Sequence, residues 1–285
     1  MGSLYTALAS YLQARSKNGK WFLRIDDLDT FRTVTGATDS ILHTLENYHF
    51  YWDGPVVYQS LRTEAYSAAF DKIEKQGLIY ACRCSRKSLA RRNTQNQETI
   101  RYPEICRNKN HSRSLPHSLR IKTDGKDVSF HDQLQGPITQ KLSQTCGDFI
   151  IKRKDNLFAY HLAVVIDDHK SHITEVLRGI DLLESTPQQS YLQRTLSIPQ
   201  PKYAHIPIVV DNSGSKLSKQ TGAQPVSSSN RSETLFNLLT LLRQAPPKEI
   251  RTARVDDIIE WGIKHWDISK LGKQKKNSFQ SRRLV

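Results

Sequence analysis

Ser215-Lys216-Leu217-Ser218-Lys219-Gln220 is the stretch from which the fold of this chain can be deduced. It follows an apolar segment at 206–210, predicted to be a buried strand, and a polar break at 211–214. Open α/β sheets bind their ligands in loops at the ends of such strands. Two ammonium groups and a hydroxyl suit a polyphosphate, because lysine is a flexible point charge. The alternative interpretation is a solvated basic turn.

The composition describes a basic, globular chain. Its 285 residues leave room for one or two domains. The net charge of +14 indicates a polyanionic partner, with nucleic acid as the first candidate, although a merely basic protein would carry the same charge. No apolar run is long enough to span a bilayer, and no signal-peptide pattern is present. We therefore expect a cytoplasmic monomer without a membrane partner.

Helix and strand patterns alternate along the chain, which predicts an α/β fold with a parallel sheet. The first elements are a helix at 4–15, a strand at 21–25, a helix at 41–45, a strand at 56–58 and a helix at 66–73. Then come two strands at 119–122 and 128–130, predicted to form a hairpin, a strand at 148–152 and an apolar run at 160–166. The last part has a polar linker at 224–232, helices at 235–242 and 258–266, and a basic, mobile tail from 270.

Charged side chains follow two of the predicted buried segments. Asp26, Asp27 and Asp29 come directly after the strand at 21–25, and could bind a metal, an ammonium group or a ribose. The alternative for these carboxylates is a capped turn. Arg178, which precedes a glycine among apolar residues, could hold a substrate carboxylate with two hydrogen bonds. Its alternative is a structural salt bridge to an aspartate.

Three of the four cysteines crowd into a short segment. Cys82, Cys84 and Cys106 indicate a zinc site in a reducing compartment, although C-x-C is less specific than paired C-x-x-C motifs. His111 is the fourth ligand that ordinary zinc preference suggests. The alternative is three buried structural thiols. Residues 85–113 around them are predicted to be a basic, flexible loop that faces nucleic acid.

Four signals that stand in one order resemble the catalytic domain of the class I glutamyl-tRNA synthetase family. They are Arg24-Ile25-Asp26-Asp27-Leu28-Asp29, Val57-Tyr58-Gln59-Ser60, Asp148-Phe149-Ile150-Ile151 with residues 160–168, and Lys216-Leu217-Ser218-Lys219. The last resembles the KMSKS signature of that family. Residues 10–15, the C-x-C…Y-x-x-x-C arrangement and the length are more similar to its glutamyl-Q tRNA(Asp) synthetase branch.

The resemblance implies a reaction and a set of site residues. The reaction is the ATP-driven activation of L-glutamate, with Mg²⁺, and transfer of glutamate to queuosine in the anticodon of tRNA(Asp). The implied glutamate contacts are Asp26, Tyr160 and Arg178. The implied ATP contacts are Lys216, Ser218 and Lys219, with Lys216 and Lys219 as catalytic residues. The implied ligands of one structural zinc ion are Cys82, Cys84, Tyr102 and Cys106, which makes Tyr102 the second candidate beside His111.

The same resemblance divides the chain. Residues 1–78 and 148–222 would be the halves of a Rossmann-like nucleotide-binding domain, 79–147 a zinc-containing insertion, and 223–285 a helical C-terminal region with a basic tail. The family has glutamate where this chain has Asp26, which shortens the reach to the substrate ammonium. It also has a strand and a HIGH-like histidine ahead of the position of Met1. We therefore expect the 285-residue chain to be poorly soluble and nearly inactive.

Two other functions fit these observations. The first is the catalytic domain of an ordinary glutamyl-tRNA synthetase, which would need an anticodon-binding module elsewhere. The second is a zinc-containing RNA-binding protein that has lost catalysis. ATP–pyrophosphate exchange with glutamate distinguishes the three, because the ordinary synthetase generally needs tRNA for activation.

Overall fold

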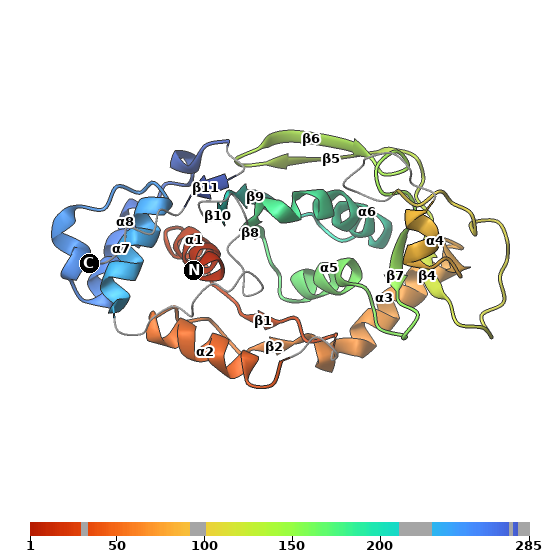
Figure 1. Ribbon diagram of the computed structural model, residues 1–285, viewed down its shortest axis with the longest axis horizontal. Helices are drawn as coiled ribbons and strands as arrows, with labels where there is room; N and C mark the ends of the chain where they lie inside the picture. Colours follow the sequence, from red (N-terminus) through yellow and green to blue (C-terminus); the bar gives the residue numbers. More distant parts are fainter. Residues whose placement is uncertain (30–33, 92–100, 211–229, 274–275, 279–285) are drawn as a thin grey trace.

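The structure, a computed structural model, describes residues 1–29, 34–91, 101–210, 230–273 and 276–278. The molecule is elongated, and the chain runs from helix α1 (Gly2–Arg15) to the opposite end and then returns to the end where it began (Figure 1). Helices α7 (Arg231–Leu241) and α8 (Val255–His265) lie at one end. The other end carries α3 (Thr63–Lys75), the short helix α4 (Arg86–Ala90) and β4 (Ser118–Ile121). The predicted lysine loop at 215–220 lies outside the described residues.

Two pairs of parallel strands occupy the middle of the molecule. β8 (Glu175–Gly179) pairs with β9 (Lys202–Ile206), and helix α6 (Thr186–Leu196) connects them. β1 (Arg24–Ile25) pairs with β2 (Val57–Tyr58) through α2 (Ala37–Asn47). The predicted parallel α/β arrangement is confirmed. Among the described strands, however, it is divided between separate small sheets.

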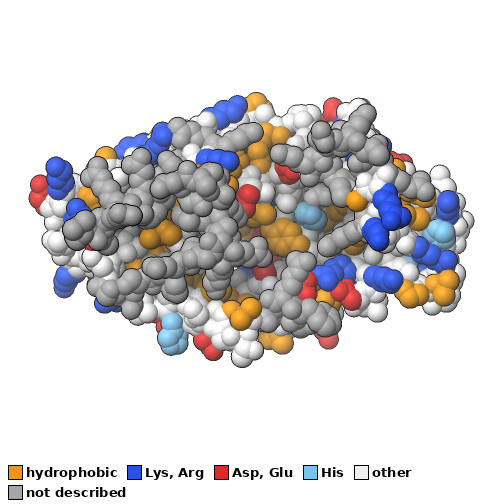
Figure 2. Space-filling model, in the orientation of Figure 1, with side chains coloured by type: hydrophobic (Ala, Val, Ile, Leu, Met, Phe, Trp, Pro, Cys, Tyr) orange, Lys and Arg blue, Asp and Glu red, His pale blue; other side chains and the backbone are white. Residues whose placement is uncertain are grey.

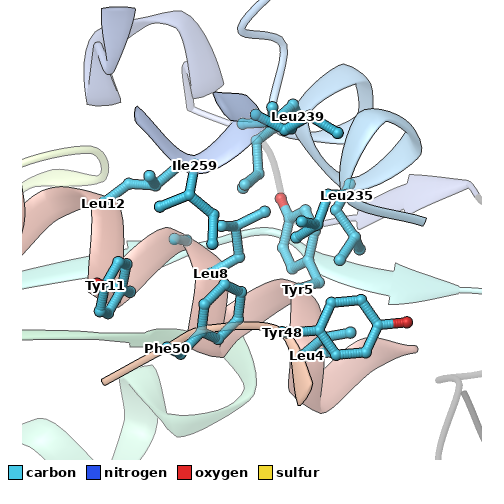
Figure 3. Packing of buried hydrophobic residues seen from close by; sticks show 14 of the residues in the cluster. Leu4, Tyr5, Leu8, Tyr11, Leu12, Tyr48, Phe50, Leu235, Leu239 and Ile259 are labelled. Carbon is cyan, nitrogen blue, oxygen red and sulfur yellow. The ribbon is translucent and has the colours of Figure 1, made fainter. Parts of the chain in front are cut away.

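Helix α1 (Gly2–Arg15) forms the centre of the larger apolar core. Its spacing of Leu4, Leu8 and Leu12 puts these side chains on one face, because residues four apart in a helix lie above one another. This face packs against Leu235 and Leu239 of α7, together with side chains of α8 and of the segment after α2 (Figure 3). The C-terminal helices are therefore part of the same core as the first helix.

Polar side chains of residues 10–15 connect α1 to four residues elsewhere in the chain. The buried Gln13 donates a hydrogen bond from Nε2 to Glu175 of β8, and its Oε1 accepts one from the indole Nε1 of Trp266 at 2.6 Å. Ser10 accepts a hydrogen bond from Trp21, and Arg15 forms an ion pair with Asp53 at 2.8 Å. The polar residues of α1 thus hold the helix in place on both sides.

The predicted hairpin at 119–122 and 128–130 is wrong. β4 instead pairs antiparallel with β3 (Ile79–Cys82) and β7 (Phe149–Lys152), in a three-stranded sheet. The hairpin that forms joins β5 (Asp127–Asp132) to β6 (Gly136–Lys141). A local turn decides this pairing, because the Asp132 carboxylate accepts the backbone N–H groups of Leu134 and Gln135.

Three further segments differ from their predictions. The expected strand at 206–210 is interrupted at Pro207, which has no N–H to donate, so β9 is followed by a separate β10 (Ile208–Val210). The expected mobile tail contains β11 (Lys276–Ser278), which pairs parallel with β10. The expected flexible loop begins with α4, because the Ser85 hydroxyl accepts the N–H of Ser88 as a helix cap.

The apolar run at 160–166 forms α5 (Tyr160–Lys170), a helix buried on most of its surface. Periodicity alone cannot separate a buried helix from a buried strand, because neither has a solvent face. α5 packs against α6 and α3, in a second apolar core that includes Phe158 and Tyr191. None of the described helices is long and apolar enough to cross a membrane.

We predict that Gly147→Ala destabilises the fold. Gly147 has a φ of 67°, and an added Cβ would lie 2.5 Å from the carbonyl oxygen of Tyr102. Gly125 is the matched control, since its φ is 71° but an added Cβ would meet no atom within 4 Å. Urea unfolding should show that Gly147→Ala loses about 1–3 kcal/mol more unfolding free energy than Gly125→Ala. Equal losses would show that the chain around Tyr102 can move aside.

Candidate functional site

Asp26 and Tyr160 line one cavity. It has a volume of about 640 Å³ and lies between the residues after β1, the start of α2 and the first residue of α5. Its wall combines charged groups, including Arg24 and Arg153, with apolar side chains such as Phe158. The structure therefore brings together two of the three side chains that the resemblance assigned to glutamate.

The three carboxylates after β1 have three different partners. Asp26 accepts a hydrogen bond from Arg24 Nε at 2.7 Å, and Arg24 also pairs with Asp168. Asp27 accepts both the N–H and the hydroxyl of Ser60. Asp29 forms an ion pair with Arg153 at 2.6 Å.

Ion pairing also affects the pKa of Arg24, which lines the cavity beside Asp26. Burial would lower the pKa of Arg24, but Asp26 and Asp168 outweigh it and raise that pKa above its usual value. Arg24 therefore remains a fixed positive charge beside Asp26. The carboxylate of Asp26 is oriented by Arg24, not free, which the sequence did not indicate.

Tyr160 is the first residue of α5 and presents its side chain at the cavity, where 38% of the residue is exposed. Burial of the phenol raises its pKa, and the nearby Arg178 opposes this shift. The hydroxyl is therefore protonated at neutral pH and can both donate and accept a hydrogen bond. Arg178 is not among the residues that line the cavity, although its charge, like those of Asp26 and Arg24, affects the pKa of this hydroxyl.

Arg178 is buried in β8, with 8% of its surface exposed. Its Nε donates to Nε2 of His205 at 3.0 Å, and its Nη2 donates to the hydroxyl of Thr186 at 2.8 Å. Within the described part of the chain, no carboxylate forms an ion pair with it and no group accepts a hydrogen bond from Nη1. The predicted alternative, a structural salt bridge, is therefore not seen among the described residues, and Nη1 has no described acceptor.

The cysteine cluster forms a compact group of donors. The sulfur atoms of Cys82, Cys84 and Cys106 lie within 4.8 Å of one another, and those of Cys84 and Cys106 are 3.7 Å apart. The hydroxyl of Tyr102 lies 3.4 Å from the Cys82 sulfur and accepts the backbone N–H of Cys106 at 3.0 Å. His111 is not in this group. Of the two candidates for a fourth donor, the fold brings Tyr102 to the cysteines.

The surroundings of this cluster favour the thiolate at Cys82 only, because burial and the neighbouring Cys106 raise the pKa of Cys84 to about 12. Burial opposes ionisation of Cys82, but hydrogen bonds with Tyr102 and Arg120 outweigh it and lower the pKa of this thiol. The guanidinium of Arg120 also lies over the ring of Tyr102, 3.7 Å from its centroid. Burial and the Cys82 sulfur raise the pKa of Tyr102, so a cation is needed to ionise the phenol. Three convergent thiols and a phenol form a donor set that suits zinc.

We expect purified protein to contain about one zinc ion per chain. Tyr102→Phe should weaken zinc retention, because it removes the fourth donor, whereas His111→Ala should leave retention unchanged. The measurement is elemental analysis after dialysis against graded concentrations of a chelator. The reverse order of the two variants would assign the fourth position to His111. Folded wild-type protein without metal would rule out the site.

Comparisons with known proteins agree with this geometry. The catalytic-domain family described as tRNA synthetases class I (E and Q) matches residues 1–253. The chain belongs to this family. A glutamyl-Q tRNA(Asp) synthetase from Methylococcus capsulatus is 42% identical over 273 residues, which cover 95% of this chain and 88% of that protein. One from Pseudomonas aeruginosa is 43% identical over 270 residues, which cover 95% and 90%.

A solved structure of this class has the same fold. A glutamate tRNA ligase from Elizabethkingia meningosepticum, crystallised with its amino acid, has a TM-score of 0.78 and 26% sequence identity. The match covers 98% of this chain but 64% of that ligase, so the chain spans under two thirds of its length. The class I catalytic domain is thus shown by both sequence and fold. Lys216, Ser218 and Lys219 lie outside the described residues, and their roles stay predictions.

Proposed function

We propose that this protein activates glutamate with ATP and transfers it to queuosine in the anticodon of tRNA(Asp). The observation that supports this proposal is Arg178, whose buried guanidinium has no described acceptor at Nη1 and whose charge lowers the pKa of Tyr160 against the effect of burial. A guanidinium held in this way matches a carboxylate better than it matches a neutral amide. Relatives that match 95% of this chain are named glutamyl-Q tRNA(Asp) synthetases, and this name supports the choice of tRNA and base.

The proposed reaction needs no nucleophile from the protein. A carboxylate oxygen of glutamate attacks the α-phosphorus of ATP and pyrophosphate leaves, and a hydroxyl of queuosine then attacks the glutamyl carbonyl and AMP leaves. Catalysis depends on alignment and on offsetting the phosphate charge. We assign the unreacting carboxylate to Arg178, the substrate ammonium to Asp26, and the phosphates to Lys216 and Lys219 with Mg²⁺.

The proposed division of the chain assigns separate tasks to its parts. We place the glutamate and ATP sites in residues 1–78 and 148–222. Residues 79–147 form the insertion, in which Cys82, Cys84, Cys106 and Tyr102 would hold a structural zinc ion. Residues 223–285 provide helices that share the core of α1, and a basic end. None of these four residues lines the cavity, so we assign this metal no part in the reaction.

We predict that Arg178→Lys raises the KM for glutamate by about 10–100-fold in ATP–pyrophosphate exchange, because lysine cannot form the paired hydrogen bonds. The KM for ATP should change little. Arg194→Lys is the control, since Arg194 forms a surface pair with Asp124. Exchange by the wild type without tRNA supports the proposal, and exchange that requires tRNA would favour an ordinary glutamyl-tRNA synthetase domain. Absence of exchange would favour an RNA-binding protein without catalysis.

We also predict that tRNA binding depends strongly on salt. Lys and Arg side chains lie along the rim of one face and gather at the end that carries α3, α4 and β4 (Figure 2). Deletion of the tail after Gly272 would remove β11, so the sharper test replaces Arg282 and Arg283, outside the described residues, with glutamine. This change should reduce the log–log salt slope by about 1–2 units, and lysine at both positions should preserve it. An unchanged slope would place the phosphate contacts elsewhere.

A further inference from the structure

His205 connects Arg178 to a second buried charge. Arg178 and His205 are register partners on the parallel strands β8 and β9. The Nε2 of His205 faces Arg178 Nε at 3.0 Å, and its Nδ1 lies 2.6 Å from an oxygen of Asp132. Both His205 and Asp132 are fully buried. Hydrogen bonds therefore connect the three side chains in series, from Asp132 at the β5–β6 turn to the guanidinium of Arg178.

The hydrogen bonds determine which nitrogen of His205 carries the proton. Asp132 acts only as an acceptor, because one of its oxygens also accepts the backbone N–H groups of Leu134, Gln135 and His205. Nδ1 must then donate to Asp132. The Nε–H of Arg178 is always a donor, so Nε2 must accept. The hydroxyl of Thr186 also lies 3.1 Å from Nε2. A neutral imidazole with its proton on Nδ1 donates to Asp132 and accepts from Arg178, the two neighbours whose hydrogen-bonding roles are fixed.

The protonation equilibria agree with this form. Burial lowers the pKa of His205, and Arg178 adds to the effect against the opposing influence of Asp132. Burial would raise the pKa of Asp132, but its hydrogen bonds with His205 and the backbone outweigh this and lower it. At neutral pH the pair is therefore a carboxylate and a neutral imidazole. The arrangement presents a fixed lone pair to Arg178.

We propose that Asp132 and His205 are positioning residues that hold the guanidinium of Arg178 in one orientation for the carboxylate of its substrate. Thr186 completes the support, because its hydroxyl accepts from Nη2 and lies 3.4 Å from the carbonyl oxygen of Leu182. Because Nε and Nη2 are both hydrogen-bonded and the guanidinium is planar, the orientation of Nη1 is also fixed. The inference rests on the proposed function only in naming glutamate as the ligand.

The reason for such a device lies in the flexibility of arginine. Its side chain loses considerable rotamer freedom on binding, and affinity improves when that cost is met before the ligand arrives. His205 accepts the hydrogen bond from Nε of Arg178. Asp132 accepts the proton on Nδ1 and so keeps Nε2 of the histidine unprotonated. The turn of the β5–β6 hairpin thereby takes part in glutamate binding without touching the ligand, as partner residues behind a metal ligand do.

Asp132→Asn is the decisive variant, because it preserves volume but reverses the tautomer. The amide nitrogen would donate to Nδ1 of His205, and the ring proton would move to Nε2, where it faces the N–H of Arg178. The full 285-residue protein, with ¹⁵N-labelled histidine, should show the Nδ1–H tautomer at His205 by NMR and the Nε2–H tautomer in the variant. The KM for glutamate should rise about 10-fold, while the KM for ATP stays unchanged.

Two controls separate positioning from general stability. Asp148→Asn alters another fully buried carboxylate, which bonds Tyr80 and Thr123 and contacts neither His205 nor Arg178. Its thermal stability should fall while its KM for glutamate is unchanged. At Thr186, serine should preserve the KM for glutamate because it retains the hydroxyl, and valine should raise it several-fold.

The outcomes distinguish this inference from the proposed function. An Nε2–H tautomer or a charged ring at His205 in the wild type would overturn the proposed hydrogen bonding from Asp132 through His205 to Arg178. An unchanged KM for glutamate after the tautomer has reversed would overturn the positioning role. A third outcome is wild-type protein that shows the Nδ1–H tautomer yet neither binds glutamate by calorimetry nor supports exchange. That result would reject the proposed function, but it would still support the orientation of Arg178 by Asp132 and His205.

Discussion

The parallel pairing of β8 with β9 is the constraint on which the candidate site depends. It places Arg178 directly opposite His205 on the adjacent strand, although the two residues are 27 positions apart in the sequence. A parallel pair needs a crossover connection, and here α6 supplies it while also contributing Thr186 to the guanidinium. The strand pairing, the connecting helix and the orientation of Arg178 are thus one structural feature.

Buried carboxylates connect residues 79–147 with the rest of the molecule at two points. Asp132 ends β5 and reaches His205, while Asp148 precedes β7 and accepts hydrogen bonds from Tyr80 and Thr123. Each buried carboxylate satisfies several donors at once, which is the condition under which burial of a charge is tolerated. Asp148 bonds Tyr80, which packs with the cysteine cluster, and Asp132 bonds His205, which contacts Arg178.

Much of this site could be predicted because its chemistry is local in sequence. Cys82 and Cys84 lie in and after one strand, and Arg178 stands next to a glycine in an apolar segment. The fourth donor was left open between Tyr102 and His111, since both positions are compatible with the spacing. The fold brings Tyr102 to the cysteines, with its backbone N–H donated to the carbonyl oxygen of Cys146, and its role as a ligand stays a prediction. No spacing rule carries that information.

The sequence by itself determined the class of protein, the alternation of helices and strands, and the residue types of the candidate site, because these follow from periodicity and from motifs within a few positions. Only the tertiary structure decided which strands pair, as the wrong hairpin at 119–130 shows, and which side chains support Arg178. His205, Asp132 and Thr186 are unremarkable in the sequence. Their roles arise because strand pairing and burial leave each polar group with few partners, and a buried hydrogen-bonding group must find one.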